Sequence, residues 1–229
     1  MKKLIAAFVG SMALASAPVA LGAEATKELK MAYDADPVTL DIHEQLSGGI
    51  LQLSHMTFDP LLRWTKDLGF EPRLAESWER VDENSMRFKL REGVKFHSGN
   101  ELTAADVKFT FDRLKQSQDF KAIFKPFSGI NIIDDYTFEL VTSEPYPLLL
   151  NTATYIFPFD SEFYSGQTED GKDKSAILKH GNSFASENLS GTGPYTVTER
   201  KQGVRVEFER FDDYWDTESP GNVGKIVLT

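Results

Sequence analysis

The sequence predicts an α/β fold, in which short strands alternate with amphipathic helices. Apolar residues occupy every second position between Met86 and Leu90, a spacing typical of a half-buried strand. Between Thr103 and Leu114 apolar residues recur at helical spacing, and Thr103 with Asp106 three residues later forms a weak capping box. Hydrophobic residues make up 41% of the 229 residues, which is enough for a sizeable core.

The first 25 residues have the composition of a secretory signal peptide. Lysines at positions 2 and 3 precede an apolar run, and we expect cleavage after Ala23 or Ala25, where the residues are small. The chain has no cysteine, so it can form neither a disulfide nor a lipid anchor on a terminal cysteine. These features predict a soluble protein that is exported to the periplasm.

Periodicity and turn residues predict the remaining elements in chain order. In the first half we expect a strand at 29–33, a helix at 50–58, strands at 86–90 and from Val94 to Phe96, and the helix at 103–114. In the second half we expect a hairpin at 130–140, a turn into a helix at 144–150, a polar loop around a short helix at 166–182, a hairpin at 196–209 and a strand at 223–228.

Charge and histidine spacing limit the possible functions. The net charge of −10 leaves no basic stripe for phosphates, so we expect no nucleic-acid partner. The four histidines, His43, His55, His97 and His180, form no zinc-protease or nucleophile-elbow pattern. We therefore expect no metal site, no cofactor and no catalytic residue, with an exported hydrolase as a remote alternative.

Several stretches resemble one known family. They are Leu74-Ala75-Glu76-Ser77-Trp78, the run from Lys89 to His97, Leu102 to Val107, Gly191-Thr192-Gly193-Pro194-Tyr195, and Phe211 to Trp215. Together they resemble the family 5 extracytoplasmic solute-binding proteins of ABC importers, which are receptors of the dipeptide, oligopeptide and nickel type. Further similar segments are Asp36 to Asp41 and Asp59-Pro60-Leu61-Leu62, so the resemblance covers essentially the whole mature chain.

The resemblance implies a fold of the periplasmic binding protein class II type. A mixed-sheet first domain, formed by 26–46 and 184–229, is expected to carry an inserted smaller α+β lobe at 47–183. Family members run to roughly twice this length or more. The resemblance therefore implies an N-terminal portion in which the first domain is incomplete and a third lobe and the C-terminal return are absent.

The resemblance also suggests residues that contact a ligand. The candidates are Gln45, Leu46, Ser47, Gly48, Tyr155, Gly191, Thr192 and Gly193. The polar segment at 45–48 corresponds to one that lies along the family's cleft, although a plain loop is equally consistent with its composition. Tyr155 suits a site that buries mixed polar and apolar solutes, whereas a core position is the ordinary alternative for any aromatic residue.

The expected function is that of a periplasmic receptor that delivers di- or oligopeptides to an inner-membrane ABC permease. Oligosaccharides, opine-like solutes and nickel chelates are the alternative ligands. Without the third lobe, this chain is expected to bind solute weakly or not at all. A monomer is expected.

Overall fold

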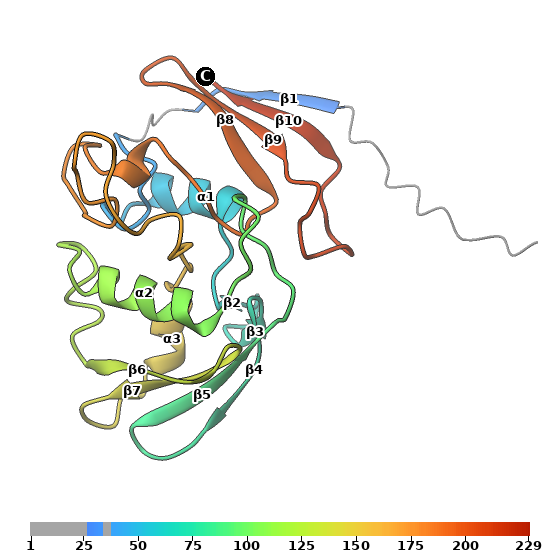
Figure 1. The fold of residues 1–229 in the computed structure, drawn as a ribbon. Helices are drawn as coiled ribbons and strands as arrows, with labels where there is room; N and C mark the ends of the chain where they lie inside the picture. The colour runs from blue at the N-terminus through green and yellow to red at the C-terminus, as the bar shows by residue number, and fades with distance from the viewer. Residues whose placement is uncertain (1–26, 34–37) are drawn as a thin grey trace, which may run out of the picture.

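The computed structural model describes residues 27–33 and 38–229, and the predicted signal peptide lies outside this part. Two four-stranded sheets stand one above the other, with helices and loops between and beside them (Figure 1). The mixed α/β class predicted from the sequence is confirmed. Within the described residues, no helix is long and apolar enough to span a membrane.

The first sheet combines a strand from the N-terminal end of the chain with three from its C-terminal end. In the order β1-β10-β9-β8, its strands are β1 (Lys27–Met31), β10 (Val223–Leu228), β9 (Arg205–Arg210) and β8 (Tyr195–Lys201). β1 runs parallel to β10 and the other pairs are antiparallel. Helix α1 (Gly48–Thr57) packs against this sheet, where Leu53 shares a core with Phe208 and Ile226.

The second sheet is antiparallel and is built from two hairpins, between which the chain forms a helix. In the order β4-β5-β7-β6, its strands are β4 (Ala75–Arg80), β5 (Ser85–Leu90), β7 (Thr137–Thr142) and β6 (Phe127–Asp134). Helix α2 (Ala104–Leu114) lies across it and buries Val107, Phe111 and Leu114 almost completely. The Asp106 carboxylate accepts the Thr103 backbone N–H at 2.8 Å, so the predicted capping box is confirmed.

Smaller elements connect the two sheets. The hairpin of β2 (Leu62–Trp64) and β3 (Phe70–Pro72) follows α1, helix α3 (Leu149–Ala153) follows β7, and a 3₁₀ turn, η1 (Phe184–Ser186), precedes β8. A buried ion pair also connects distant segments. Arg113 of α2 donates to the Asp41 carboxylate at 2.8 Å, and the same nitrogen lies 2.9 Å from Nδ1 of His43. This pair fixes the segment before α1 against α2.

Two predicted elements are wrong. Val94 to Phe96 is not a strand, because Gly93 and Gly99 adopt left-handed φ angles of 73° and 96° and leave too short a segment to pair. Only an isolated bridge between Lys95 and Glu101 forms there. The polar loop at 166–182 contains no helix; its turns are held by a bridge from Gln167 to Asp173 and by backbone hydrogen bonds such as that from Thr168 to Lys172 at 2.8 Å.

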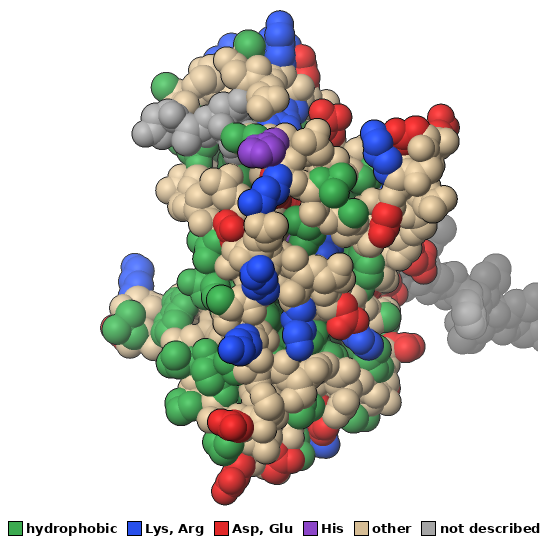
Figure 2. Space-filling view, turned by 90° about the vertical axis from the view of Figure 1, so that its left-hand side faces the viewer, with side chains coloured by type: hydrophobic (Ala, Val, Ile, Leu, Met, Phe, Trp, Pro, Cys, Tyr) green, Lys and Arg blue, Asp and Glu red, His purple; other side chains and the backbone are tan. Residues whose placement is uncertain are grey.

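The surface agrees with the acidic composition. On the face shown in Figure 2, Lys and Arg side chains are interspersed with acidic and hydrophobic ones and form no continuous basic stripe. Several of the basic side chains of the described residues are already paired with neighbouring carboxylates, as Lys108 is with Asp112 at 2.6 Å. This distribution suits a solvated surface rather than a phosphate-binding one.

Candidate functional site

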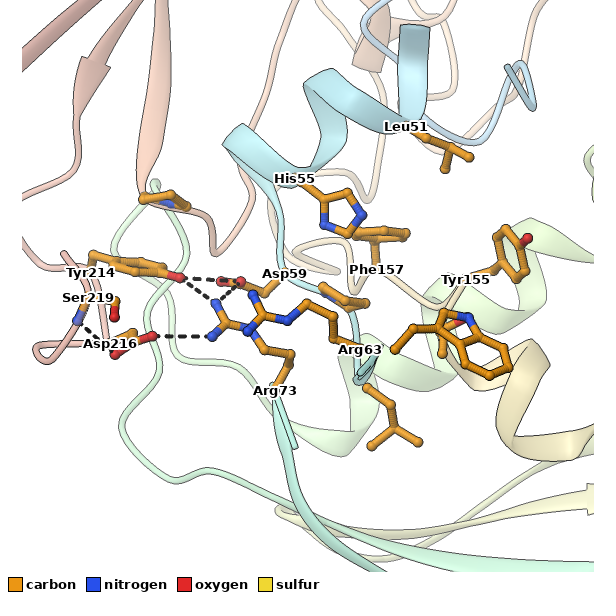
Figure 3. Close-up of a pocket in the computed structure, with 15 residues that line it drawn as sticks. Leu51, His55, Asp59, Arg63, Arg73, Tyr155, Phe157, Tyr214, Asp216 and Ser219 are labelled. Atoms are coloured by element: carbon orange, nitrogen blue, oxygen red, sulfur yellow. Dashed lines mark hydrogen bonds and ion pairs between the residues drawn. The ribbon is translucent and has the colours of Figure 1, made fainter. Parts of the chain in front are cut away.

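A cleft of about 620 Å³ opens between the end of α1, the β2–β3 hairpin and the loop after β9 (Figure 3). This volume lies within the range of small-molecule sites. The residues that line it are Leu51, His55, Asp59, Pro60, Leu62, Arg63, Trp64, Arg73, Thr154, Tyr155, Phe157, Pro194, Tyr214, Asp216 and Ser219. One end of the cleft is polar and the other is largely aromatic.

Arg73 organises the polar end. Its Nη2 donates to Oδ1 of Asp59 at 2.6 Å and to the Tyr214 hydroxyl at 2.7 Å, while Nη1 donates to Asp216 at 3.2 Å (Figure 3). The Asp59 side chain is 5% exposed and the Arg73 side chain 13% exposed. A pair this well shielded from water needs these additional hydrogen bonds to offset the cost of desolvation.

Trp215 also contacts the Arg73–Asp59 pair. Its Nε1 donates to Oδ2 of Asp59 at 2.9 Å, and the Arg73 guanidinium lies 4.8 Å from the centre of its ring. Burial raises the pKa of Asp59, and the ion pair with Arg73 opposes that shift. Burial lowers the pKa of Arg73, but attraction to Asp59 outweighs it and the net pKa is raised. The net pKa of Asp59 remains raised, because burial outweighs the attraction to Arg73.

The local sequence explains why these residues meet. Helix α1 ends where Phe58 turns to extended backbone, and Pro60, which lacks an N–H, follows directly after Asp59. The backbone N–H of Asp59 donates to the hydroxyl of Thr192 at 3.1 Å, which fixes this corner. Arg73 directly follows β3, so the short β2–β3 hairpin returns the chain to the same corner.

The other end of the cleft is formed by Trp64, Tyr155 and Phe157. His55 packs edge-on against Phe157, with ring centres 5.2 Å apart. Burial lowers the pKa of His55, Asp59 opposes the shift, and Arg63 and Arg73 add to it. Figure 3 shows Tyr155 and Tyr214 at opposite ends of the cleft.

Of the eight residues predicted to contact a ligand, Tyr155 lines this cleft. The segment at 45–48 instead starts helix α1. Ser47 is its N-cap and accepts the Ile50 N–H, and the Leu46 N–H donates to Asp119 at 3.0 Å. Gln45 is exposed, and Gly48 is the first residue of the helix.

Gly191, Thr192 and Gly193 are buried against the end of α1. A Cβ on Gly191 would lie 2.0 Å from the carbonyl oxygen of Thr57, so only glycine allows this approach. Gly193 donates its N–H to the same oxygen at 3.0 Å. These three residues pack against the segment at the end of α1 and do not line the cleft. The next residue, Pro194, does line it.

Sequence reasoning did not predict that Asp59, Arg73 and Tyr214 meet. The segments that carry two of them, Asp59 to Leu62 and Phe211 to Trp215, were noted for their family resemblance. Nothing in their spacing indicates that they meet, because Asp59 and Tyr214 lie 155 residues apart along the chain. Among the residues that the structure describes, no three His, Asp or Glu side chains gather as metal ligands would.

The mixed α/β fold carries an open cleft of about 620 Å³, a size that small-molecule sites share. The profile described as bacterial extracellular solute-binding proteins, family 5 middle, matches residues 69–229. The chain belongs to this family of solute-binding proteins. The resemblance stated from its motifs is confirmed.

Individual relatives agree with this assignment. The dipeptide-binding protein of Escherichia coli K12 is 30% identical over 168 residues, covering 64% of this chain and 30% of that protein. The periplasmic oligopeptide-binding protein OppA of Salmonella typhimurium is 26% identical over 240 residues, covering 93% of this chain and 41% of that protein. This chain thus spans well under half of the length of these relatives.

The fold likewise resembles solved structures. The oligopeptide-binding protein AppA of Bacillus subtilis, solved with a nonapeptide, superposes with a TM-score of 0.76 at 23% identity. The match covers 88% of this chain and 39% of AppA. The predicted periplasmic-binding-protein type of fold is confirmed.

Proposed function

We propose that this chain is part of the substrate-binding component of an ABC importer, which captures di- or oligopeptides in the periplasm and delivers them to a permease in the inner membrane. Family membership together with the cleft of about 620 Å³ is the observation that carries the proposal. The ligand is bound and released without any change in its covalent bonds.

The composition of the cleft supports a peptide ligand. A peptide offers amide groups for the polar end and side chains for the apolar end, and both kinds of surface line one cleft. In such receptors lobes close around the ligand, and the closed form is the one that a permease recognises. We propose that the receptor acts as a monomer.

The two sheets support a division into lobes. We propose that 26–46 and 184–229 belong to a first domain and that 47–183 is largely an inserted lobe. Helix α1 packs on β8 of the first sheet, which favours placing the start of the inserted lobe close to Phe58.

A thermal-shift screen tests the proposed function. The protein is purified at the natural length of its gene product and is mixed with di-, tri- and pentapeptides, oligosaccharides, opines and nickel–histidine chelates. A ligand that binds only the folded state raises the melting temperature, by an amount that increases with ligand concentration. We expect a shift with peptides. A shift with only a sugar, an opine or a nickel chelate would replace the peptide assignment, and no shift with any solute would refute the receptor.

A further inference from the structure

The aromatic end of the cleft presents rings that are supported on one side and open on the other. Trp64 is 41% exposed, although it is among the largest apolar side chains in the protein. Its ring packs against Phe70 on the partner strand, with ring centres 4.5 Å apart. Because Phe70 supports one side of the indole, Trp64 is held in place while it remains available to a ligand.

Tyr155 and Phe157 approach the cleft from the segment that follows α3. Phe157 is 3% exposed and is held by His55, so it forms the floor. Tyr155 is half-buried, and within the described residues its hydroxyl makes no hydrogen bond to another protein group. A bound molecule could therefore contact the ring and also use the hydroxyl.

The polar end, by contrast, provides little discrimination by charge. Among the lining residues, the positive charges of Arg63 and Arg73 are matched by the negative charges of Asp59 and Asp216. Arg73 is already bonded to both of these carboxylates, and Arg63 pairs with Glu71 on the neighbouring strand. A ligand would thus meet satisfied charges at one end and open aromatic surface at the other.

We propose that Trp64, Tyr155 and Phe157 form a side-chain subsite that selects peptides carrying a large apolar or aromatic residue. The inference rests on the proposed function, because it specifies which peptides that receptor prefers. An aromatic side chain of a peptide that packs against Trp64 or Tyr155 would exchange contact with water for ring-to-ring contact. Replacing that side chain with a methyl group removes most of this buried area, which corresponds to a loss of about 10- to 100-fold in affinity.

The test is calorimetric titration of the natural-length protein with matched tripeptides. Trialanine is compared with the three tripeptides in which phenylalanine replaces alanine at each position in turn. Wild-type protein should bind at least one of the phenylalanine peptides about 10- to 100-fold more tightly than trialanine. Trp64→Ala and Tyr155→Ala should each reduce the ratio between the affinities for the preferred phenylalanine peptide and for trialanine to less than about three-fold.

A matched control lies on the same hairpin. Leu68 is 79% exposed at the tip between β2 and β3 and does not line the cleft, so Leu68→Ala should leave both affinities unchanged. Thermal melts show whether each variant is folded. Because Trp64 and Tyr155 lie on separate segments, one variant still tests the subsite if the other is unstable.

The possible outcomes separate the two proposals. Peptide binding without preference for phenylalanine, or a preference that both alanine variants retain, would overturn the subsite and leave the receptor intact. A preference lost equally in Leu68→Ala would also overturn it, because the effect would then belong to the hairpin as a whole. If no peptide binds the wild-type protein, the receptor function itself fails and the subsite fails with it.

Discussion

Arg73 and Asp59 form an ion pair of 2.6 Å that joins the end of the β2–β3 hairpin to the segment after α1. The same guanidinium reaches Tyr214 and Asp216, in the loop after β9. One side chain therefore holds three chain segments at one end of the cleft, and Tyr214 in the last of them lies 141 residues after Arg73. We expect this network to determine the shape of the cleft more than any single ligand contact does.

Replacing Arg73 should destabilise the protein strongly. Arg73→Ala leaves the buried carboxylate of Asp59 without its cation, and the loss of one partner of a buried pair costs about 3–5 kcal/mol in the free energy of unfolding. Denaturant unfolding measures the free energy of unfolding of Arg73→Ala. Lys89→Ala is the control, because Lys89 pairs with Glu76 on the exposed face and an exposed ion pair contributes little to stability. Equal stability of Arg73→Ala and Lys89→Ala would contradict the role assigned to Arg73.

A second buried pair allows a comparison within one helix. Arg113 and Asp41 are almost fully buried, whereas Lys108 and Asp112 on the same helix are exposed. Arg113→Met should lower the free energy of unfolding by about 3–5 kcal/mol, while Lys108→Met should have little effect. Chemical denaturation checks both variants. The expectation is wrong if Arg113→Met unfolds at the same denaturant concentration as the parent.

Gly191 should not tolerate a side chain. A Cβ there would lie 2.0 Å from the Thr57 carbonyl oxygen and 2.6 Å from Cδ1 of Phe58. Overpacking against backbone should cost about 3 kcal/mol or more in Gly191→Ala. Gly129→Ala is the control, because nothing lies within 4 Å of its added Cβ. Melting temperatures measure the difference, and similar values for the two variants would refute the close approach.

His97 should make stability depend on pH. Its Nδ1 accepts the Gly191 N–H at 3.3 Å, and its Nε2 donates to the Gly193 carbonyl at 2.9 Å. Burial lowers the pKa of His97 from 6.5 to about 4, against the opposing effect of the Gly193 carbonyl. The neutral ring is favoured in the folded state, so its contribution is present above pH 6.5 and is lost as the pH falls towards 4. The loss is about 3 kcal/mol over these roughly 2.5 pH units.

His97→Gln isolates this contribution, because the amide can still accept and donate but does not titrate in this range. Denaturant unfolding at pH 7 and at pH 4.5 measures the free energy of unfolding of both proteins, and the wild type should lose more stability between these two pH values than the variant does. The same loss in both proteins would show that the other buried groups, such as His43, account for the pH dependence.

Local features were predictable from the sequence because they depend on neighbouring residues. The capped helix from Thr103, the hairpin of β6 and β7 and the final strand β10 all follow from short-range periodicity and turn residues. Strand β4 was missed because Ala75 to Arg80 is mostly polar and only weakly alternating. The β2–β3 hairpin was missed because each strand has only three residues.

The cleft depends instead on contacts between distant residues. Arg73 meets Tyr214 across 141 positions, and no periodicity in either segment encodes that contact. Gly191, Thr192 and Gly193 were expected to contact a ligand, whereas the structure packs them closely on the end of α1. Tyr155 was singled out as an aromatic residue suited to a mixed cleft, and it does line the cleft.

Hydrogen–deuterium exchange of the natural-length protein, with and without a saturating peptide, tests most directly whether this cleft holds the ligand. We predict slower amide exchange on binding in three segments: 62–64, 154–157 and 211–219. The outer strands β4 and β6 should exchange at unchanged rates and serve as the internal control. Saturating binding of a peptide with unchanged exchange in all three cleft segments would contradict the account.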